Sequence, residues 1–152
     1  MKKTEIGIKT LNVAIKRINS EATIPKYQLV ADAGCDLYCC KDILIPVGKV
    51  VMVNSGIALK VPHGYEAQVR PRSGLAVKKG ISIINTPATI DSDYIGEIKV
   101  GLINLGEEDV EIKKGDRFAQ LVFCPVYKAV FHEVDSLGST ERGSGGFGHT
   151  GS

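Results

Sequence analysis

Residues 50–61 read VVMVNSGIALKV, and this stretch predicts two short β-strands joined at a bend. Val51 and Val53 occupy alternate positions in the first half. Ile57 and Leu59 do the same in the second half, after the turn-forming sequence Asn-Ser-Gly. Successive side chains of a strand point to opposite faces, so each half has one apolar face for a core and one face for water.

Three further segments show the same alternation of apolar residues: 11–15, 65–69 and 98–102. The segments are separated by Gly, Pro, Asn and Asp, and no long stretch has the period of an amphipathic helix. An all-β fold built as a sandwich, jelly roll or closed barrel is therefore expected. One short helix is expected to begin near Ser73 and to end at Gly80, a residue type that is common just after a helix.

Composition limits the classes of protein to which the chain can belong. Its 152 residues and apolar fraction of 43% suit one domain with a single core. The net charge of +2 is scattered, which argues against a nucleic-acid polymer as partner but allows a small phosphorylated ligand. The four cysteines form no C-x-x-C pair, so we expect buried free thiols. Neither a signal peptide nor an apolar run of about 20 residues is apparent, so we expect a cytoplasmic protein without a membrane segment.

The composition changes abruptly at the C-terminus, where residues 138–152 are rich in Gly and Ser. Such termini are usually mobile and without function. Arg142 nevertheless offers a forked cation for phosphate oxygens, Phe147 offers a stacking face, and the glycines between them allow backbone N–H groups to face an anion. The spacing G-x-x-x-x-G-H-T resembles a P-loop without its lysine, so a glycine-rich phosphate wrap is the functional alternative.

Several polar residues permit both a functional and a structural interpretation. In the segment RPRSG, Arg72 and Ser73 are suited to bind phosphate, whereas the structural alternative is a solvated turn with Ser73 as helix N-cap. Asp36 is interpreted as a helix N-cap or a turn acid. Asp116 and Arg117 are interpreted as a surface ion pair of little energetic value.

Residues 85–97 combine polar, acidic and aromatic side chains around a predicted turn. Pro87 favours a β-hairpin that carries Asn85 and Asp91 on opposite arms, with Tyr94 near its base. Taken alone, such a cluster is more often a polar turn than a site.

Five segments, taken in order, resemble the motifs of the homotrimeric dUTPase family: AGCDL (33–37), PRSGL (71–75), NTPATIDSDYIGEI (85–98), GDRFAQLVF (115–123) and RGSGGFGHTG (142–151). The resemblance covers nearly the whole chain. It implies an all-β, jelly-roll or β-clip subunit with one short helix, assembled as a three-fold homotrimer with active sites at the subunit junctions. It also implies a body of residues 1–137 and a flexible arm of residues 138–152 that closes over the active site.

The resemblance implies a dUTP diphosphatase that hydrolyses dUTP to dUMP and pyrophosphate, which limits uracil in DNA and supplies dUMP for dTMP synthesis. Asp91 would orient the attacking water, and Tyr94 would pack under the deoxyribose. The substrate-binding set would comprise Arg72, Ser73, Gly74, Asn85, Thr89, Tyr94, Gln120, Arg142, Ser144, Gly146, Phe147, Gly148 and His149. Mg²⁺ would be held by the phosphates and by water without a direct protein ligand, with Asp36 nearby.

Two alternatives to this function remain open: a bifunctional dCTP deaminase and dUTPase, and a regulatory dUTPase that binds a repressor. The chain departs from the residues usual in the family at Ala88, Ile95, Phe118 and His149. Ala88 stands where Gly is usual, which would cost about 1 kcal/mol if the position needs a positive φ. His149 would place a titratable group near the outer phosphates and make arm closure sensitive to pH near neutrality.

Overall fold

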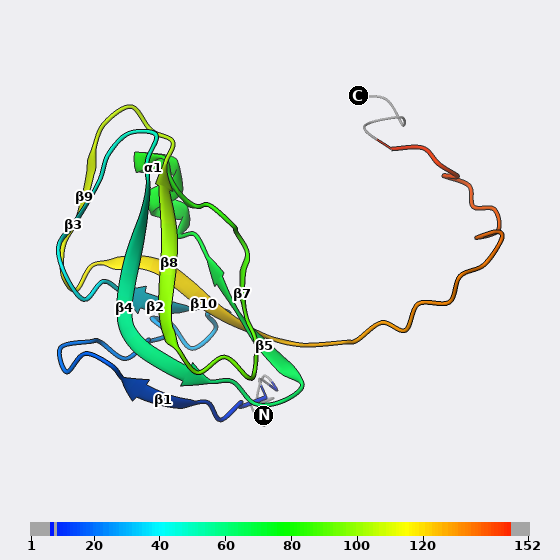
Figure 1. Ribbon diagram of the computed structural model, residues 1–152, viewed down its shortest axis with the longest axis horizontal. Helices are drawn as coiled ribbons and strands as arrows, with labels where there is room; N and C mark the ends of the chain where they lie inside the picture. Colours follow the sequence, from blue (N-terminus) through cyan, green and yellow to red (C-terminus); the bar gives the residue numbers. More distant parts are fainter. Residues whose placement is uncertain (1–6, 8, 147–152) are drawn as a thin grey trace, which may run out of the picture.

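The protein is represented by a computed structural model that describes Gly7 and residues 9–146. Two antiparallel four-stranded sheets form its body (Figure 1). The first sheet has the order β1-β4-β8-β6, with the bounds Ala14–Arg17, Val50–Lys60, Glu97–Asn104 and Ile81–Ile83. The second has the order β2-β10-β5-β7, with the bounds Cys35–Tyr38, Arg117–Pro125, Tyr65–Arg70 and Ala88–Ile90. The fold is completed by a ribbon and a helix: β3 (Ile43–Ile45), β9 (Val110–Ile112) and α1 (Ser73–Lys79).

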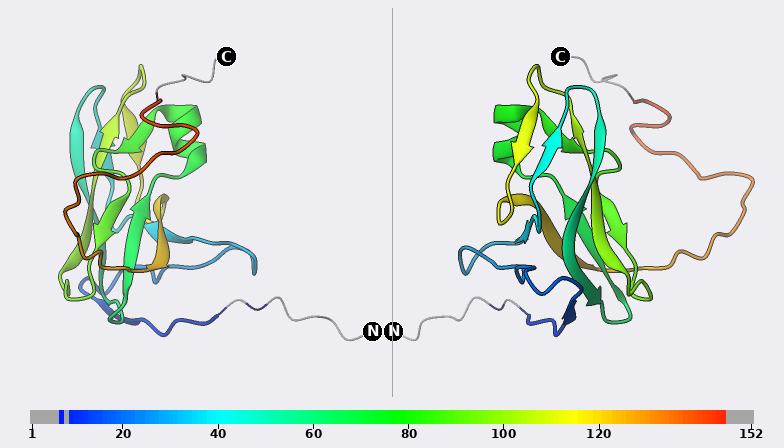
Figure 2. Two further views of the ribbon diagram at one scale, coloured as in Figure 1. Left: turned by 90° about the vertical axis from the view of Figure 1, so that its right-hand side faces the viewer. Right: turned by 60° about the vertical axis from the view of Figure 1, so that its left-hand side comes forward.

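One hydrophobic core contains residues of both sheets, and Figure 2 shows these sheets from two further sides. The first sheet contributes the alternate residues Ile98, Val100 and Leu102 of β8. The second contributes Ala67 and Val69 of β5. Burial of this apolar surface is the main stabilising contribution to the fold. The architecture confirms the all-β prediction with one short helix.

The predicted alternation of residues 65–69 and 98–102 is confirmed by β5 and β8. The helix is also confirmed, because α1 begins at Ser73 and is followed by Gly80 in the left-handed conformation, with φ of 66°. Its N-cap is Arg72, whose side chain makes no capping bond. The interpretation of Ser73 as the N-cap is therefore wrong.

The prediction that residues 11–15 have one buried face holds only in part, because Leu11 and Val13 are partly buried but Ile15 is exposed. β1 begins only at Ala14, and all four of its residues are exposed. Among the described strands it pairs only with β4, at the edge of its sheet. Val13, just before the strand, is partly buried against the core, whereas Ile15 is exposed. The core therefore extends as far as Val13 but does not include the edge strand β1.

The segment 50–61 is also corrected, because its residues up to Lys60 form one continuous strand instead of two strands at a bend. The register of β4 on β8 shifts between Asn54 and Ala58, which is a β-bulge. Gly56 within the bulge has a positive φ of 70°. Its N–H donates to Glu97 Oε1 at 3.0 Å, and Asn54 Nδ2 donates to Glu97 Oε2 at 3.0 Å. The Glu97 carboxylate therefore stabilises the bulge from the neighbouring strand.

The predicted β-hairpin around Pro87 is wrong. β6 and β7 flank this turn but belong to different sheets, since β6 pairs with β8 and β7 pairs with β5. The chain crosses between the sheets here, with Asn85 before β7 and Asp91 after it. Ala88 is the first residue of β7, and an extended backbone suits any residue. The cost expected for the missing glycine does not arise.

The C-terminal segment leaves the sandwich after β10. This strand ends at Pro125, and the Val126 N–H donates to the Gly64 carbonyl oxygen at 2.9 Å. Residues 127–144 are all exposed and run away from the body (Figure 1). This exposed segment includes residues 138–144 of the expected arm and also residues 127–137, which precede it. Within the described residues, no helix has the length and apolar character that a membrane span needs.

We expect Gly56→Ala to destabilise the fold by about 2 to 4 kcal/mol. Alanine disfavours the positive φ, and its Cβ would lie 2.8 Å from the Ala22 Cβ. Gly48→Ala is the matched control, because Gly48 has the same φ of 70° and an added Cβ would meet nothing within 4 Å. Urea denaturation followed by circular dichroism should show a loss of only about 1 kcal/mol for the control. Equal losses would contradict the packing argument.

Candidate functional site

A polar hollow of about 380 Å³ opens beside β2, β5, β10 and the start of α1. Four of the predicted substrate-binding residues meet there: Arg72, Ser73, Gly74 and Gln120. The full lining, which defines the polar hollow, is Gln28, Asp32, Ala33, Gly34, Asp36, Arg70, Arg72, Ser73, Gly74, Arg117, Gln120 and Val122.

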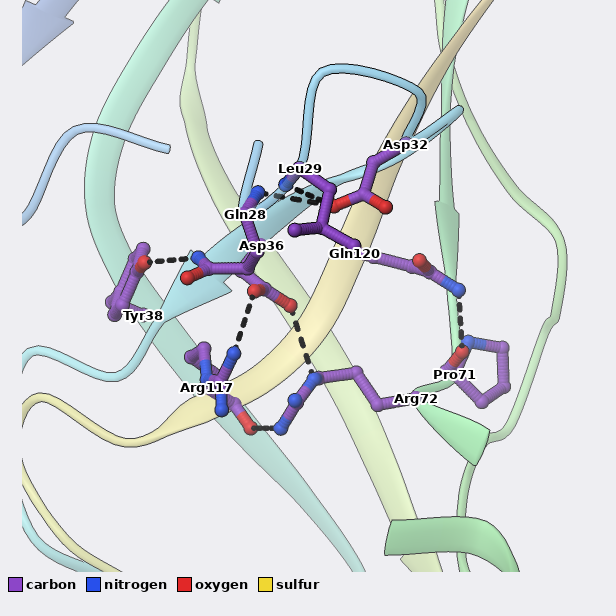
Figure 3. Close-up of polar contacts among 9 residues, drawn as sticks. All are labelled: Gln28, Leu29, Asp32, Asp36, Tyr38, Pro71, Arg72, Arg117 and Gln120. Atoms are coloured by element: carbon purple, nitrogen blue, oxygen red, sulfur yellow. Dashed lines mark hydrogen bonds and ion pairs between the residues drawn. The ribbon is translucent and has the colours of Figure 1, made fainter. Parts of the chain in front are cut away.

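Asp36 organises the charges of the polar hollow, because its buried carboxylate holds one arginine with each oxygen (Figure 3). Oδ1 lies 3.0 Å from Arg72 Nε, and Oδ2 lies 3.2 Å from Arg117 Nη1. Arg72 Nη1 also donates to the Arg117 carbonyl oxygen at 2.8 Å. Both guanidinium groups are therefore oriented by the protein itself, which favours binding of an anion at low entropic cost.

The prediction that Asp116 and Arg117 form a surface ion pair is wrong. Arg117 is the first residue of β10, and its side chain reaches Asp36 on the paired strand β2. Asp116 Oδ2 instead accepts a bond from the Lys113 N–H at 2.9 Å and closes the turn before β10. Arg117 is thus a site residue that the sequence interpretation missed. Its place in the GDRFAQLVF segment was the available signal.

Gln120 enters the polar hollow from β10, and its Nε2 donates to the Pro71 carbonyl oxygen at 3.1 Å (Figure 3). A loop that also lines the polar hollow is shaped by Asp32. Its Oδ2 accepts bonds from the backbone N–H groups of Gln28 at 3.1 Å and Leu29 at 2.8 Å. Gln28 and Asp32 are further lining residues that no sequence motif had singled out.

The lining of the polar hollow has an excess of positive charge. The arginines Arg70, Arg72 and Arg117 face two aspartates, Asp32 and Asp36, which leaves one positive charge in excess. Forked guanidinium groups bind phosphate oxygens well. The polar hollow is therefore suited to a phosphorylated ligand.

Asp91 lies at a second hollow of about 580 Å³, which we call the turn hollow and which is lined by His63, Gly64, Tyr65, Asp91, Ser92, Asp93, Val126 and Lys128. No described residue lines both hollows. Strand register explains their separation, because Ile90 pairs with Ala67 near the start of β5, whereas Arg70 at its end borders the polar hollow.

Tyr94 lies in the turn that follows Asp91. Its N–H donates to the Asp91 carbonyl oxygen at 3.2 Å, and its hydroxyl donates to the Glu97 carbonyl oxygen at 2.8 Å. The ring also covers Gly96, where an added Cβ would lie 2.6 Å from the Tyr94 hydroxyl oxygen. Tyr94 is nevertheless 45% exposed, so the ring is held in place and stays accessible to a ligand.

Among the residues that the structure describes, the remaining predicted substrate-binding residues line neither hollow. Asn85 and Thr89 are exposed around β7. The exposed C-terminal segment carries Arg142, Ser144 and Gly146. Three predicted residues fall outside the described part of the chain: Phe147, Gly148 and His149. Within the described part of one chain, the phosphate-binding candidates Arg72, Ser73, Gly74 and Gln120 meet, whereas Asn85, Thr89 and Arg142 lie apart from them.

The cysteines do not support thiol chemistry at this site. All four are free, as predicted, and three of them are buried. Burial raises the pKa of the Cys35 and Cys39 thiols, which keeps them protonated near neutral pH. In the described residues, no group of three or more His, Cys, Asp or Glu side chains is arranged to hold a metal ion.

Comparison with known proteins finds relatives along nearly the whole chain. The dUTPase family model matches residues 20–151. A deoxyuridine 5′-triphosphate nucleotidohydrolase of Syntrophotalea carbinolica is 49% identical over 146 residues, covering 95% of this chain and 99% of the relative. A protein of the same name from Nautilia profundicola is 52% identical over 141 residues, covering 93% of this chain and 99% of the relative.

Solved structures with the same fold also match the chain. A mutant of the Staphylococcus bacteriophage 80alpha dUTPase with dUpNHpp has a TM-score of 0.86 at 23% identity, covering 94% of this chain and 100% of that chain. A mutant dUTPase from phage phi11 of S. aureus, described with a structural Mg(II) ion, has a TM-score of 0.75 at 20% identity, covering 83% of this chain and 98% of that chain. At this level of identity the likeness shows the fold.

Asp36→Asn should lower the free energy of unfolding by about 1 to 2 kcal/mol, because two oriented arginines lose their carboxylate. The loss is limited since the Arg72 and Arg117 side chains are 27% and 42% exposed. Asp135→Asn removes the same charge from an exposed side chain that forms no ion pair with a described residue, and it should leave the urea denaturation midpoint unchanged. A wild-type midpoint for Asp36→Asn would contradict this role of the carboxylate.

Proposed function

The chain belongs to the dUTPase family, and we infer that it is a dUTP diphosphatase that hydrolyses dUTP to dUMP and pyrophosphate. The observation that carries this conclusion is the family match, which runs over residues 20–151 and includes all five motif segments. The activity limits uracil incorporation into DNA and supplies dUMP for dTMP synthesis. The curated relatives carry the name of the hydrolase, so a dCTP deaminase and a repressor-binding regulator are not favoured.

For the phosphate chain of dUTP, we propose the polar hollow as the binding site. Arg72, Ser73, Gly74 and Gln120 line it together, and its excess positive charge supports this assignment. Asp36 supports the site indirectly, because its ion pairs with Arg72 and Arg117 hold both guanidinium groups in place. Charge-assisted bonds from prearranged donors stabilise the developing charge of phosphoryl transfer.

The proposed reaction is an in-line attack of water on the α-phosphorus. Asp91 orients the water, whose oxygen forms a bond to the α-phosphorus while the bond to the bridging oxygen of the leaving pyrophosphate breaks. No covalent enzyme intermediate forms. Tyr94 packs under the deoxyribose and excludes a 2′-hydroxyl, which fits its accessible ring beside Asp91. Asn85 and Thr89 recognise uracil.

This reaction requires more than one copy of the chain, and we propose a three-fold homotrimer. Glu66 lies near Asp91 and Arg70 lies at the polar hollow. The two residues are four positions apart in strand β5, which is about 13 Å of extended chain. A water molecule oriented by Asp91 of the same chain would therefore be too far from these arginines. Asp91 of one copy and the polar hollow of another would form the site.

An exposed apolar patch on the first sheet supports assembly. Val50, Met52 and Ile84 surround Gly101, where an added Cβ would lie 3.1 Å from Ile84 Cγ2, 3.5 Å from Met52 Sδ and 3.6 Å from Val50 Cγ1. The three side chains are 48%, 54% and 55% exposed in the isolated chain. Contiguous exposed apolar surface is typical of protein contacts. The arm of residues 138–152, with Arg142, would close over the site so formed.

Mg²⁺ is proposed as the cofactor, carried by the triphosphate. The donor groups fit a metal held by phosphate oxygens and water, because both oxygens of Asp36 already bind arginines. When bound, Mg²⁺ would neutralise phosphate charge. A cytoplasmic location is also proposed, since free cysteines are typical of a reducing compartment.

Purified protein with Mg²⁺ should release pyrophosphate from dUTP and not from dTTP, dCTP or UTP. Asp91→Asn should lower kcat for dUTP by about 10²- to 10⁴-fold with little change in KM, because the variant no longer activates the water. Asp93→Asn, an exposed carboxylate in the same turn, is the matched control and should keep near wild-type kcat. Ammonia release from dCTP, or pyrophosphate release without preference for dUTP, would overturn the assignment.

Gly96→Ala should weaken discrimination against UTP. The added methyl group would displace the Tyr94 ring, which packs on Gly96. We expect the ratio of kcat/KM for dUTP to that for UTP to fall by about tenfold, equivalent to about 1.4 kcal/mol of discrimination. Ile95→Ala in the same turn alters a side chain that is 70% exposed and should leave the ratio unchanged. An unchanged ratio in Gly96→Ala would remove Tyr94 from its proposed role.

A further inference from the structure

Arg70 lies in the polar hollow, but the residues proposed above to bind dUTP do not include it. It is the last residue of β5 and is half-buried. In the pairing of β5 with β10, it lies opposite Gln120. The strand thus places Arg70 beside the residues that bind the phosphate chain.

A row of hydrogen bonds along β5 fixes the direction of the Arg70 side chain. Gln68 Nε2 donates to Glu66 Oε1 at 2.6 Å, which leaves Gln68 Oε1 facing the arginine. This oxygen accepts bonds from Arg70 Nε at 3.0 Å and from Arg70 Nη2 at 2.6 Å. The three residues are alternate positions of one strand and point to the same face. Glu66 and Gln68 therefore hold the guanidinium before a ligand arrives.

The charge of Arg70 is not neutralised within the described residues. Arg72 and Arg117 are both paired with Asp36, whereas Arg70 forms no ion pair with a described side chain. Its partner Gln68 is neutral. Arg70 therefore adds a positive charge that no ion pair with a described side chain offsets. A guanidinium has five N–H donors, and the Gln68 contact leaves most of them available.

We propose that Arg70 binds the triphosphate of dUTP directly, as an additional phosphate-binding arginine, and that Glu66 and Gln68 are its positioning residues. This inference rests on the proposed function, which supplies the phosphorylated ligand. A forked cation held by the protein binds phosphate oxygens with two bonds and loses little side-chain entropy. Arg70 would therefore strengthen binding of the phosphates and would not contact the base or the sugar.

The first experiment compares Arg70→Gln, Arg70→Lys and wild type by steady-state kinetics. We expect Arg70→Gln to raise KM for dUTP by about tenfold or more while kcat changes less, because one charge-assisted contact is lost. Inhibition by pyrophosphate should weaken by a similar factor, whereas inhibition by deoxyuridine, which has no phosphate, should not change. Arg70→Lys should recover part of the loss. Lys16→Gln removes an exposed charge on β1 and should match wild type.

The second experiment tests the positioning residues. Gln68→Leu keeps a similar volume but cannot accept the Arg70 bonds, so KM for dUTP should rise by a smaller factor than in Arg70→Gln. The double variant should have the same KM for dUTP as Arg70→Gln alone, since both changes remove the same contact of Arg70 with the phosphates. An additive loss in the double variant would contradict the positioning role.

Pyrophosphate binding measured by calorimetry separates this inference from the proposed function. A weaker affinity of Arg70→Gln for pyrophosphate supports the inference, whether or not the wild type hydrolyses dUTP. A wild type that does not hydrolyse dUTP would refute only the proposed function. Wild-type KM and wild-type pyrophosphate affinity in Arg70→Gln would overturn the inference. It would also be overturned if the variant only changed the sedimentation of the assembly, because Arg70 would then pair with a neighbouring copy.

Discussion

The side chains of strand β5 alternate between the hydrophobic core and the face on which the polar hollow lies, so one strand builds both. Ala67 and Val69 point into the core, whereas Arg70 and the other polar residues of the strand point away from it. β10 and β7 pair on its two sides. A shift of one residue would expose the core pair and bury a charged row. The same register places Arg70 opposite Gln120 and carries Asp91 to the other end of the strand.

The parts of the fold that could be predicted are those in which local periodicity and burial agree. β5 and β8 have strand neighbours on both sides, so their apolar positions are core positions. The pattern at residues 11–15 is equally regular, but Ile15 lies on an edge strand and stays exposed. The bulge in β4 could not be predicted locally, because Gly56 is stabilised by Glu97, which lies 41 residues away. Strand pairing also decided against the hairpin around Pro87, since its two strands join different sheets.

For the site, as for the fold, local patterns predicted which residues matter but not which distant residues they contact. Residue types and motif resemblance predicted the segments that meet in the polar hollow, including Arg72 and Gln120. They did not predict the interaction that joins the segments. Asp116 stands beside Arg117 in sequence and suggests a local ion pair, but Asp36 is the partner, 81 residues away. A pairing of β2 with β10 is needed to bring those charges together, and no local pattern contains that information.

The proposed assembly would explain two features of the chain. Asp91 and the arginines lie toward opposite ends of β5, so the proposed in-line attack, which needs contacts of about 3 Å, would require groups from two copies. The C-terminal segment also exposes Tyr127, Val130 and Phe131 by 92%, 78% and 92%, although ordering such side chains costs entropy that only burial offsets. Contact with another copy would cover these residues and supply the missing half of the site. In this arrangement the stability of the assembly and the geometry of the reaction depend on the same interfaces.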